Sequence, residues 1–442
     1  MKSDSAKSVN DLLALLPSCE ALDPEHYSID GAKPSALLAP KDHETLSRIL
    51  EVANNSHLSV CFEGSGTKIQ MGNPPSRLDL IVLTKNLSSV LEYVPEDLTI
   101  SAQAGIKLKD LKKTLAKNGQ FVPLDPLISE EATVGGTIST NSAGPLRAGY
   151  GGVKSFLLGV KVANADGRIS KAGGKVVKNV SGYDLTKLYI GALGTLGGIV
   201  EANLKVYPSP ESESTLLVFF TEMDALQGYA RRLISGNIVP AAIEFLNREI
   251  FSSMKKYVRK SMVDLPYCIA IRFFGSQIAV SNQAREAERI AGDKLGTDVF
   301  LREESSGFWV DFSRRIASNS ALAFKASVPR SSMSSVISKL EEALSFYLPF
   351  IYAEVSVGLV HFSLQRDLQV SDYELLAKKL AELRNHCEEL GGNLVMMSAP
   401  RQLKNYFDAW GKVPAGFALM KTLKEKFDPN GILSPGRFVN GL

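Results

Sequence analysis

The segment of residues 132–144 constrains this chain more than any other part of its sequence. It reads Ala-Thr-Val-Gly-Gly-Thr-Ile-Ser-Thr-Asn-Ser-Ala-Gly, with five glycine or alanine positions, five small hydroxyl side chains and Asn141. Such a segment fills a core poorly, but its backbone N–H groups and hydroxyls can approach an anion closely. Two further glycine-rich segments, residues 63–68 and 191–198, lie in the same half of the chain. Three such segments predict a long, phosphate-containing cofactor that several loops contact.

Length and charge narrow the class of protein. A chain of 442 residues exceeds what one core usually organises, so two domains are expected. Charged residues make up 22% of the chain and leave a net charge of only +3, which gives no case for binding nucleic acid. The four cysteines are widely spaced and form no CxxC pair, which favours buried free thiols in a reducing compartment over disulfides.

No apolar run is long enough to span a membrane. Leucines at positions 12, 13, 15 and 16 are accompanied by Asp4 and Asp11, which favours a short amphipathic helix over a targeting peptide.

The first half reads as alternating strands and helices. Asp42 is a predicted N-cap for a helix over residues 43–53, and Asn118-Gly119 is a predicted helix stop. Strands are expected over residues 58–62, 81–83, 98–104, 157–163 and 199–206. Pro208 and Pro210, followed by residues 211–214, form the best linker candidate.

Beyond this linker the order strand, helix, strand, strand, helix, strand occurs twice. The first copy covers residues 215–220, a helix that Thr221 and Asp224 would cap, 241–246, 267–274, 277–294 and 298–301. The second covers 322–328, 333–344, 351–356, 359–364, 372–390 and 394–397, with Ser371 and Glu374 as the capping box of its long helix. The pattern predicts two ferredoxin-like split βαβ modules that could share one sheet.

Two common nucleotide-binding motifs are absent. A Rossmann fingerprint starting at Gly64 would need a glycine where Ile69 stands. A Walker loop ending at Gly174-Lys175 would need a glycine at Ile169 and a serine or threonine at Val176.

Taken in order, residues 64–67, 131–144 and 178–198 resemble the FAD-binding domain of the vanillyl-alcohol-oxidase superfamily, also called the PCMH type. Residues 427–437 (Phe-Asp-Pro-Asn-Gly-Ile-Leu-Ser-Pro-Gly-Arg) resemble the closing segment of its D-2-hydroxyacid dehydrogenase branch. Within that branch the chain is most similar to FAD-binding subunits of bacterial glycolate oxidase. The resemblance implies an α+β fold: an N-terminal helical segment over residues 1–29, a PCMH-type FAD-binding domain over 30–209, and a cap domain of two split βαβ modules over 210–442.

The resemblance also implies which residues hold FAD. The backbone of Gly64, Ser65, Gly66 and Thr67 would bind the pyrophosphate, with Lys68 as a countercharge. The remaining expected FAD contacts are Pro126, Thr133, Gly135, Gly136, Thr137, Asn141, Gly194, Gly197 and Ile199. For Tyr183 and Asp184, packing and capping of the next helix is as good an interpretation as contact with the cofactor.

Several positions depart from the family pattern. The FAD-binding segments contain no histidine or cysteine for covalent attachment, so non-covalent FAD is expected. Leu193 stands where catalytic branches usually carry an acidic residue, and Glu63 stands where arginine is frequent. The histidine-rich strand of the branch reads Glu-Val-Ser-Val-Gly-Leu-Val-His-Phe at residues 354–362, and no metal site is expected.

Oxidation of a 2-hydroxy acid requires a base for the hydroxyl proton and a cation for the carboxylate. His361 is the candidate base, although a histidine in an apolar strand is more often a hydrogen-bonded core residue. Arg147, Arg272 and Lys325 could each hold a carboxylate or have structural roles.

These features predict an FAD-binding subunit of a glycolate-oxidase-like 2-hydroxyacid dehydrogenase complex. The resemblance implies a paralogous flavin subunit and an iron–sulfur subunit as partners, glycolate or lactate as substrate, and a cytoplasmic location that is peripheral to the inner membrane through the partners. Two alternatives remain open: a self-sufficient FAD oxidoreductase for a hydroxy acid or alcohol, and a non-catalytic assembly subunit with a vestigial FAD site.

Overall fold

The computed structural model describes residues 14–16, 19–128, 130–175, 183–292, 296–318, 322–366 and 368–442. Residues 12 and 13 of the expected N-terminal helix, part of the motif at 178–198 and the predicted helix end at Lys294 lie outside these ranges. The chain forms two compact units. The first contains residues 1–143, 152–209 and 412–442, and the second contains residues 144–151 and 210–411. Residues 412–442, expected in the C-terminal domain, thus belong to the first unit.

A four-stranded sheet with the order β1-β2-β4-β3 opens the first unit. Its strands are β1 (Glu20–Leu22), β2 (Ala36–Ala39), β3 (Val60–Glu63) and β4 (Leu80–Leu83). Helix α2 (His43–Asn55) packs Leu46, Ile49 and Leu50 into the core beside this sheet. Asp42 accepts a hydrogen bond from the Thr45 N–H at 2.7 Å, which confirms the predicted N-cap.

A five-stranded antiparallel sheet with the order β5-β6-β10-β8-β9 forms the second layer of this unit. Its strands are β5 (Val90–Val94), β6 (Thr99–Gln103), β8 (Leu157–Ala163), β9 (Ile169–Gly173) and β10 (Gly198–Lys205). Strand β9 was not predicted, because its residues alternate weakly in polarity. The remaining elements are α3 (Leu108–Ala116), β7 (Gln120–Phe121), α4 (Val134–Ser139), α6 (Val153–Phe156), α7 (Thr186–Tyr189), β11 (Tyr207–Pro208) and α15 (Phe417–Phe427).

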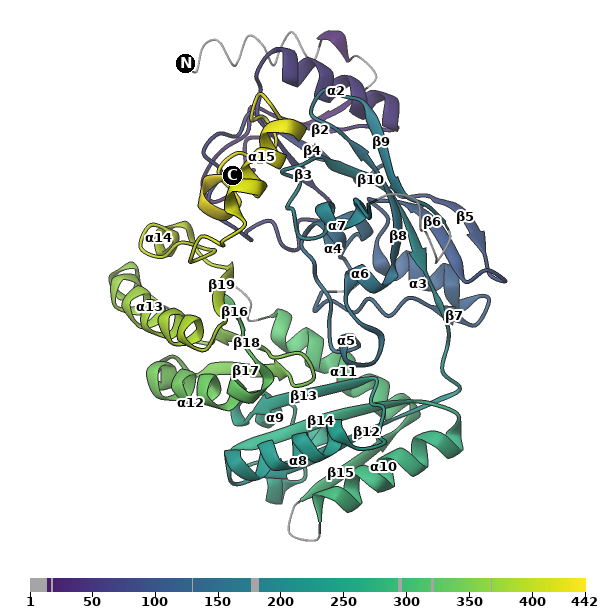
Figure 1. Cartoon of the computed structure of the whole chain (residues 1–442), viewed down its shortest axis with the longest axis vertical. Coiled ribbons are helices and arrows are strands. Elements are labelled where there is room, and N and C mark those ends of the chain that lie inside the picture. Colours follow the sequence, from purple (N-terminus) through teal and green to yellow (C-terminus); the bar gives the residue numbers. More distant parts are fainter. Residues whose placement is uncertain are drawn as a thin grey trace. The chain divides into compact units, whose positions relative to one another are not determined.

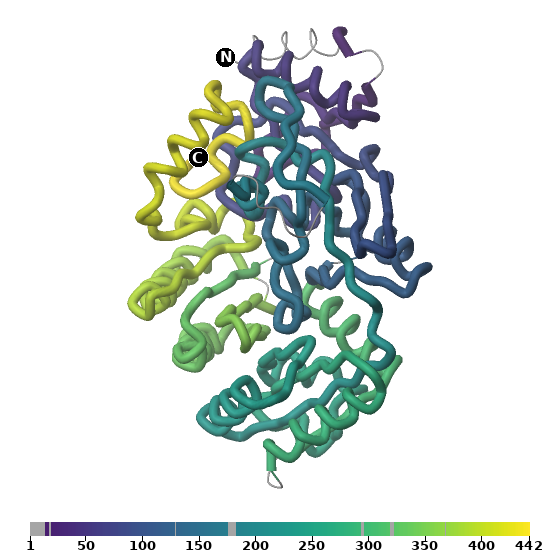
Figure 2. Tube along the Cα trace, turned by 45° about the vertical axis from the view of Figure 1, so that its right-hand side comes forward, coloured from purple at the N-terminus to yellow at the C-terminus, as the bar shows by residue number. Residues whose placement is uncertain are grey.

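The C-terminal segment joins the first unit through main-chain hydrogen bonds to β3. The Val60 N–H donates to the Ile432 carbonyl at 2.7 Å, and the Ser434 N–H donates to the Val60 carbonyl at 2.8 Å. Both views show this yellow segment beside the purple N-terminal strands (Figures 1 and 2). These bonds explain why the last residues of the chain fold with its first half.

One eight-stranded sheet organises the second unit, in the order β15-β12-β14-β13-β17-β18-β16-β19 (Figure 1). Its halves have the ferredoxin-like strand order and join where β13 pairs with β17, so the prediction of two split βαβ modules in one sheet is confirmed. The strands are β12 (Ser212–Phe220), β13 (Ala242–Asn247), β14 (Tyr267–Gly275), β15 (Thr297–Leu301), β16 (Ala323–Ser327), β17 (Pro349–Glu354), β18 (Leu359–Leu364) and β19 (Asn393–Ser398).

Four helices cover the apolar face of this sheet: α8 (Met223–Ser235), α10 (Gln277–Ala291), α12 (Met333–Leu344) and α13 (Tyr373–Glu389). The opposite face is contacted by α5 (Arg147–Tyr150), α9 (Arg248–Ser253) and α11 (Arg302–Ala317), and α14 (Arg401–Lys404) follows β19. Because side chains alternate along a strand, each strand also presents residues to this second face, and several of these are polar.

Two predicted caps are wrong. Helix α8 begins after Glu222 without a side-chain cap, so Thr221 does not form the predicted capping box. At α13 the capping box joins Gln369 and Asp372 at the start of a short 3₁₀ turn, instead of Ser371 and Glu374. The additional turn shifts the first capped position toward the N-terminus.

Candidate functional site

The three glycine-rich segments lie against one another in the first unit. A Cβ atom added to Gly64 would lie 2.1 Å from Thr133 Oγ1, which places the first segment against the start of α4. The Leu193 N–H donates to the Ser139 carbonyl at 2.9 Å, which joins the third segment to the end of α4. A Cβ on Gly198 would lie 2.4 Å from the Phe62 ring, so the third segment also packs beside the first. Only glycine permits these approaches.

The first segment presents unused hydrogen-bond donors. Within the described part of the chain, the N–H groups of Gly64, Ser65, Gly66 and Thr67 have no acceptor. They directly follow the end of β3, and Gly66 has a φ of 71° that favours glycine. Consecutive N–H groups without partners in a turn suit the oxygens of a phosphate.

The second segment forms a short helix, which the sequence did not predict. Thr133 accepts a hydrogen bond from the Gly136 N–H at 3.2 Å as the N-cap of α4. The Gly135 N–H donates to the Ala104 carbonyl at 2.7 Å, and a Cβ on Gly135 would lie 2.8 Å from the Ala104 Cβ. The Thr137 hydroxyl donates to the Thr133 carbonyl. Much of the glycine and hydroxyl content therefore serves close packing of α4, while Asn141, with a φ of 48°, is exposed at its end.

The other predicted FAD contacts vary in exposure. Pro126, Gly197 and Ile199 are buried, whereas Gly194 and Lys68 are half-buried. Tyr183 is 95% exposed and so does not pack as proposed for it. Asp184 accepts a hydrogen bond from the Thr186 hydroxyl, but the N-cap of α7 is Leu185 and the helix has no side-chain cap.

A buried lysine ties the C-terminal segment to the third glycine-rich segment. Lys424 Nζ donates to the Thr195 carbonyl at 2.9 Å, the Leu433 carbonyl at 2.7 Å and Asp428 Oδ2 at 2.6 Å. Three acceptors satisfy the ammonium group fully. Burial nevertheless lowers the pKa of Lys424, and Asp428 opposes that shift. The sequence did not predict this contact, because Thr195 is brought next to Lys424 only by the tertiary structure.

Glu63 lies directly before the unused donors of the first segment. Burial raises the pKa of its carboxyl group to about 7, although the positive charge of Arg437 opposes the shift. Tyr27 donates a hydrogen bond to Glu63 Oε2. Arg437 Nη2 donates to the Ile69 carbonyl and, at 2.7 Å, to the Met71 carbonyl. A titratable acid therefore lies beside the predicted phosphate-binding turn.

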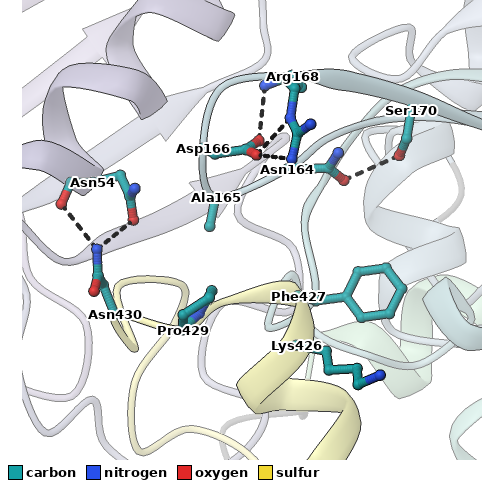
Figure 3. A pocket seen from close by; sticks show the side chains of 10 residues that line it. All are labelled: Asn54, Asn164, Ala165, Asp166, Arg168, Ser170, Lys426, Phe427, Pro429 and Asn430. Atoms are coloured by element: carbon teal, nitrogen blue, oxygen red, sulfur yellow. Dashed lines mark hydrogen bonds and ion pairs between the residues drawn. The ribbon is translucent and has the colours of Figure 1, made fainter.

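A cavity of about 300 Å³ occurs elsewhere in the first unit. None of the predicted FAD residues lines it. Asn430 donates to Asn54 Oδ1 at 3.1 Å, and Ser170 donates to Asn164 Oδ1 at 3.0 Å, across its wall (Figure 3). The cavity is therefore distinct from the turn at residues 64–67, whose N–H donors are unused.

In the second unit, the face of the sheet opposite the α8, α10, α12 and α13 layer carries a row of polar side chains. His361 on β18 is paired across the strands with Tyr352 and with Lys325, and its ring stacks on Tyr352 at a centroid distance of 4.6 Å. His361 Nε2 lies 3.1 Å from Glu354 Oε1. Glu354 in turn pairs with Glu244 across β13 and β17. Five residues of this face form the polar row: Glu244, Tyr352, Glu354, His361 and Lys325.

The three candidate carboxylate-binding residues differ in their surroundings. Arg147 Nε lies 3.5 Å from Glu354 Oε2, beside the polar row. Arg272 Nη2 lies 2.6 Å from Glu213 Oε2, so its charge is already matched on β12 and β14. The pKa of Lys325 is lowered, first by burial and then by Arg147, while Glu354 opposes the shift. Arg147 and Lys325 thus act on the same part of the row.

The described residues contain no group of three or more histidine, cysteine, aspartate or glutamate side chains arranged to hold a metal ion. Within the same residues, no helix combines the length and apolar character needed to cross a lipid bilayer.

Comparison with known proteins identifies the family. Residues 34–173 match the FAD binding domain model, and residues 209–438, more than half of the chain, match the model for the C-terminal domain of FAD linked oxidases. The chain belongs to the FAD-linked oxidase family. The family shows that FAD is the cofactor, and the first two glycine-rich segments lie within the matched FAD-binding domain. The unused donors of residues 64–67 suit the oxygens of its pyrophosphate.

Relatives in this family include the glycolate oxidase subunit GlcD of Bacillus subtilis, 30% identical over 93% of this chain and 91% of that protein. D-lactate dehydrogenases of Archaeoglobus fulgidus and Anaerostipes hadrus are 27% and 24% identical, over 93% and 92% of this chain and 93% and 90% of those proteins. In fold the chain is similar to p-cresol methylhydroxylase, with a TM-score of 0.73 at 15% identity over 99% of this chain and 97% of that one. The predicted PCMH-type fold, the superfamily, FAD and an FAD-dependent oxidoreductase are confirmed.

Proposed function

We propose that this chain oxidises a small 2-hydroxy acid, glycolate or lactate, as the FAD-binding subunit of a glycolate-oxidase-like complex. The names of its relatives support this substrate class, since they include a glycolate oxidase subunit and D-lactate dehydrogenases. The observation that carries the proposal is the contact of 3.1 Å between His361 and Glu354 on a sheet face lined by charged groups.

FAD supplies the hydride acceptor when it is bound. Gly64 to Thr67 hold its pyrophosphate through their N–H groups, and Lys68 adds positive charge. The other contacts are those expected from the sequence: Pro126, Thr133, Gly135, Gly136, Thr137, Asn141, Gly194, Gly197 and Ile199. The cofactor is held without a covalent bond, because the described parts of these segments offer no histidine or cysteine side chain.

His361 removes the proton of the substrate hydroxyl in this proposal. A carboxylate that contacts one ring nitrogen orients an imidazole and stabilises the imidazolium formed when the ring takes a proton. Glu354 is placed for both effects, and the stacked Tyr352 ring limits rotation of His361. The same contacts would also satisfy a structural histidine, so only a kinetic test separates the two roles.

Replacement of His361 by glutamine tests this role. We expect the rate of flavin reduction by glycolate to fall about 10²–10⁴-fold, because proton transfer by a positioned side chain contributes that much. The FAD content should stay unchanged. His386→Gln is the matched control, because His386 lies on α13 and contacts Ser335 on the other side of the sheet. Full turnover in His361→Gln would remove His361 from the mechanism.

The partners are a separate part of the proposal. We propose that a paralogous flavin subunit and an iron–sulfur subunit receive the electrons, and that the complex is cytoplasmic and peripheral to the inner membrane through those partners. Native mass measurement of the tagged complex, with iron and flavin analysis, tests this assembly. Repeated turnover of glycolate by a protein isolated without iron, as opposed to a single reduction of its flavin, would support the self-sufficient alternative.

A further inference from the structure

Lys325 occupies a central position in the polar row. It lies on β16 directly opposite His361 on β18, and directly opposite pairs in an antiparallel sheet have Cβ atoms about 4.5–5.5 Å apart. Glu354 lies on β17, one strand beyond His361, and Glu244 lies on β13, one strand further. Lys325 is therefore nearest to the candidate base and more distant from both carboxylates of the row.

The ammonium group of Lys325 has no protein partner among the residues that the structure describes. Neither a hydrogen bond nor an ion pair of this side chain occurs there, although the residue is half-buried. A cation that is partly withdrawn from water without a counter-ion is costly, and proteins normally pair such groups. The cost is explained if a ligand supplies the missing negative charge.

Arg147 offers further donors at the same place. Its Nε atom lies 3.5 Å from Glu354 Oε2, while its two terminal nitrogens have no partner in the described part of the chain. After burial, the positive charge of Arg147 is the strongest cause of the lowered pKa of Lys325. A carboxylate bound by both cations would relieve this repulsion, and guanidinium donors match the two oxygens of a carboxylate.

We infer that Lys325, together with Arg147, binds the carboxylate of the substrate and that Lys325 makes the site specific for an anion. This inference rests on the proposed function, because it names the groups that would hold the acid beside His361. The hydroxyl-bearing carbon of a 2-hydroxy acid is bonded to its carboxylate. Lys325, as the cross-strand neighbour of His361, would therefore bring the hydroxyl toward that histidine.

The test is calorimetric titration of the FAD-loaded protein with acetate and with acetamide. Acetate has the carboxylate but no hydroxyl to oxidise, and acetamide is its neutral isostere, so binding is measured independently of turnover. We expect the wild type to bind acetate and to reject acetamide. Lys325→Met should weaken acetate binding about 10–100-fold, the usual effect of losing a hydrogen bond to a charged group, and Lys325→Arg should retain most of it.

Stability separates this role from a structural one. Methionine resembles lysine in shape, and replacing an unpaired buried charge by an apolar side chain is often neutral or stabilising, so Lys325→Met should melt no lower than the wild type. Lys378→Met, an exposed change on α13, is the control for general effects of charge. Equal acetate binding by the wild type and Lys325→Met, or a wild type that fails to distinguish acetate from acetamide, would overturn the inference. If acetate binds as expected but no hydroxy acid reduces the flavin, the proposed function fails while the anion site stands.

Discussion

At the scale of single residues, Glu63 is the most unusual group of the FAD-binding unit. The family frequently has arginine at this position, whereas here a carboxyl group lies beside the turn of unused donors. Its burial favours the protonated form in the folded protein and raises its pKa to about 7, while the nearby charge of Arg437 opposes this shift. The glutamate at this one position therefore makes the charge beside the predicted FAD-binding turn depend on pH.

Stability should depend on pH through Glu63. Its pKa is about 7 in the folded protein and near the ordinary value of 4.5 when unfolded, so between these values the folded state binds the additional proton. The stabilising contribution is complete below pH 4.5 and is lost as the pH rises through 7. Urea unfolding at pH 5 and pH 8 should show a larger loss of unfolding free energy in the wild type than in Glu63→Gln. An identical pH dependence in the two proteins would show that Glu63 is ionised in the folded state throughout.

At the scale of elements, the C-terminal helix α15 stabilises the third glycine-rich segment through Lys424. Removing one partner of a buried ion pair leaves an uncompensated charge and typically costs about 3–5 kcal/mol. Lys424→Met should lower the unfolding free energy by this amount, because Asp428 and two carbonyls lose their donor. Thermal and urea unfolding measure the change. Lys426→Met, an exposed change on the same helix, should cost less than about 0.5 kcal/mol. Similar losses in the two variants would contradict a specific role for Lys424.

Rules that use only residues close together in sequence predicted some helices and caps correctly. They missed features that depend on contacts between distant parts of the chain. The cap at Asp42 depends on residues three positions apart, so the sequence alone sufficed. Helix α4 was missed because Gly135 has a low helix propensity, which close packing against Ala104 overrides. The predicted FAD turn at Gly64 is adjacent to Thr133 only through the fold.

The polar row shows the same limit for the candidate site. The sequence indicated His361, Arg147 and Lys325 one by one, but strand register and helix packing decide which of them share a face. Glu354 was quoted in the histidine strand without a role, and its contact with both His361 and Arg147 depends on tertiary structure. Arg272, equally plausible from sequence, is matched by Glu213 instead.

At the scale of the whole molecule, the chain divides its chemistry between two units. The first unit contains the three glycine-rich segments and the C-terminal segment, and the second unit carries the polar row on its eight-stranded sheet. This division explains why the glycine-rich motifs identify the cofactor, while the substrate has to be inferred from the second unit.

The most direct test of the proposed oxidation is anaerobic mixing of the purified, FAD-loaded chain with glycolate or D-lactate while the visible absorbance of the flavin is recorded. We expect one of these acids to bleach the flavin, with one equivalent of acid consumed per flavin, because no electron acceptor is present. A chain that keeps its FAD and shows no bleaching with either acid would contradict the proposal that its own residues oxidise a 2-hydroxy acid.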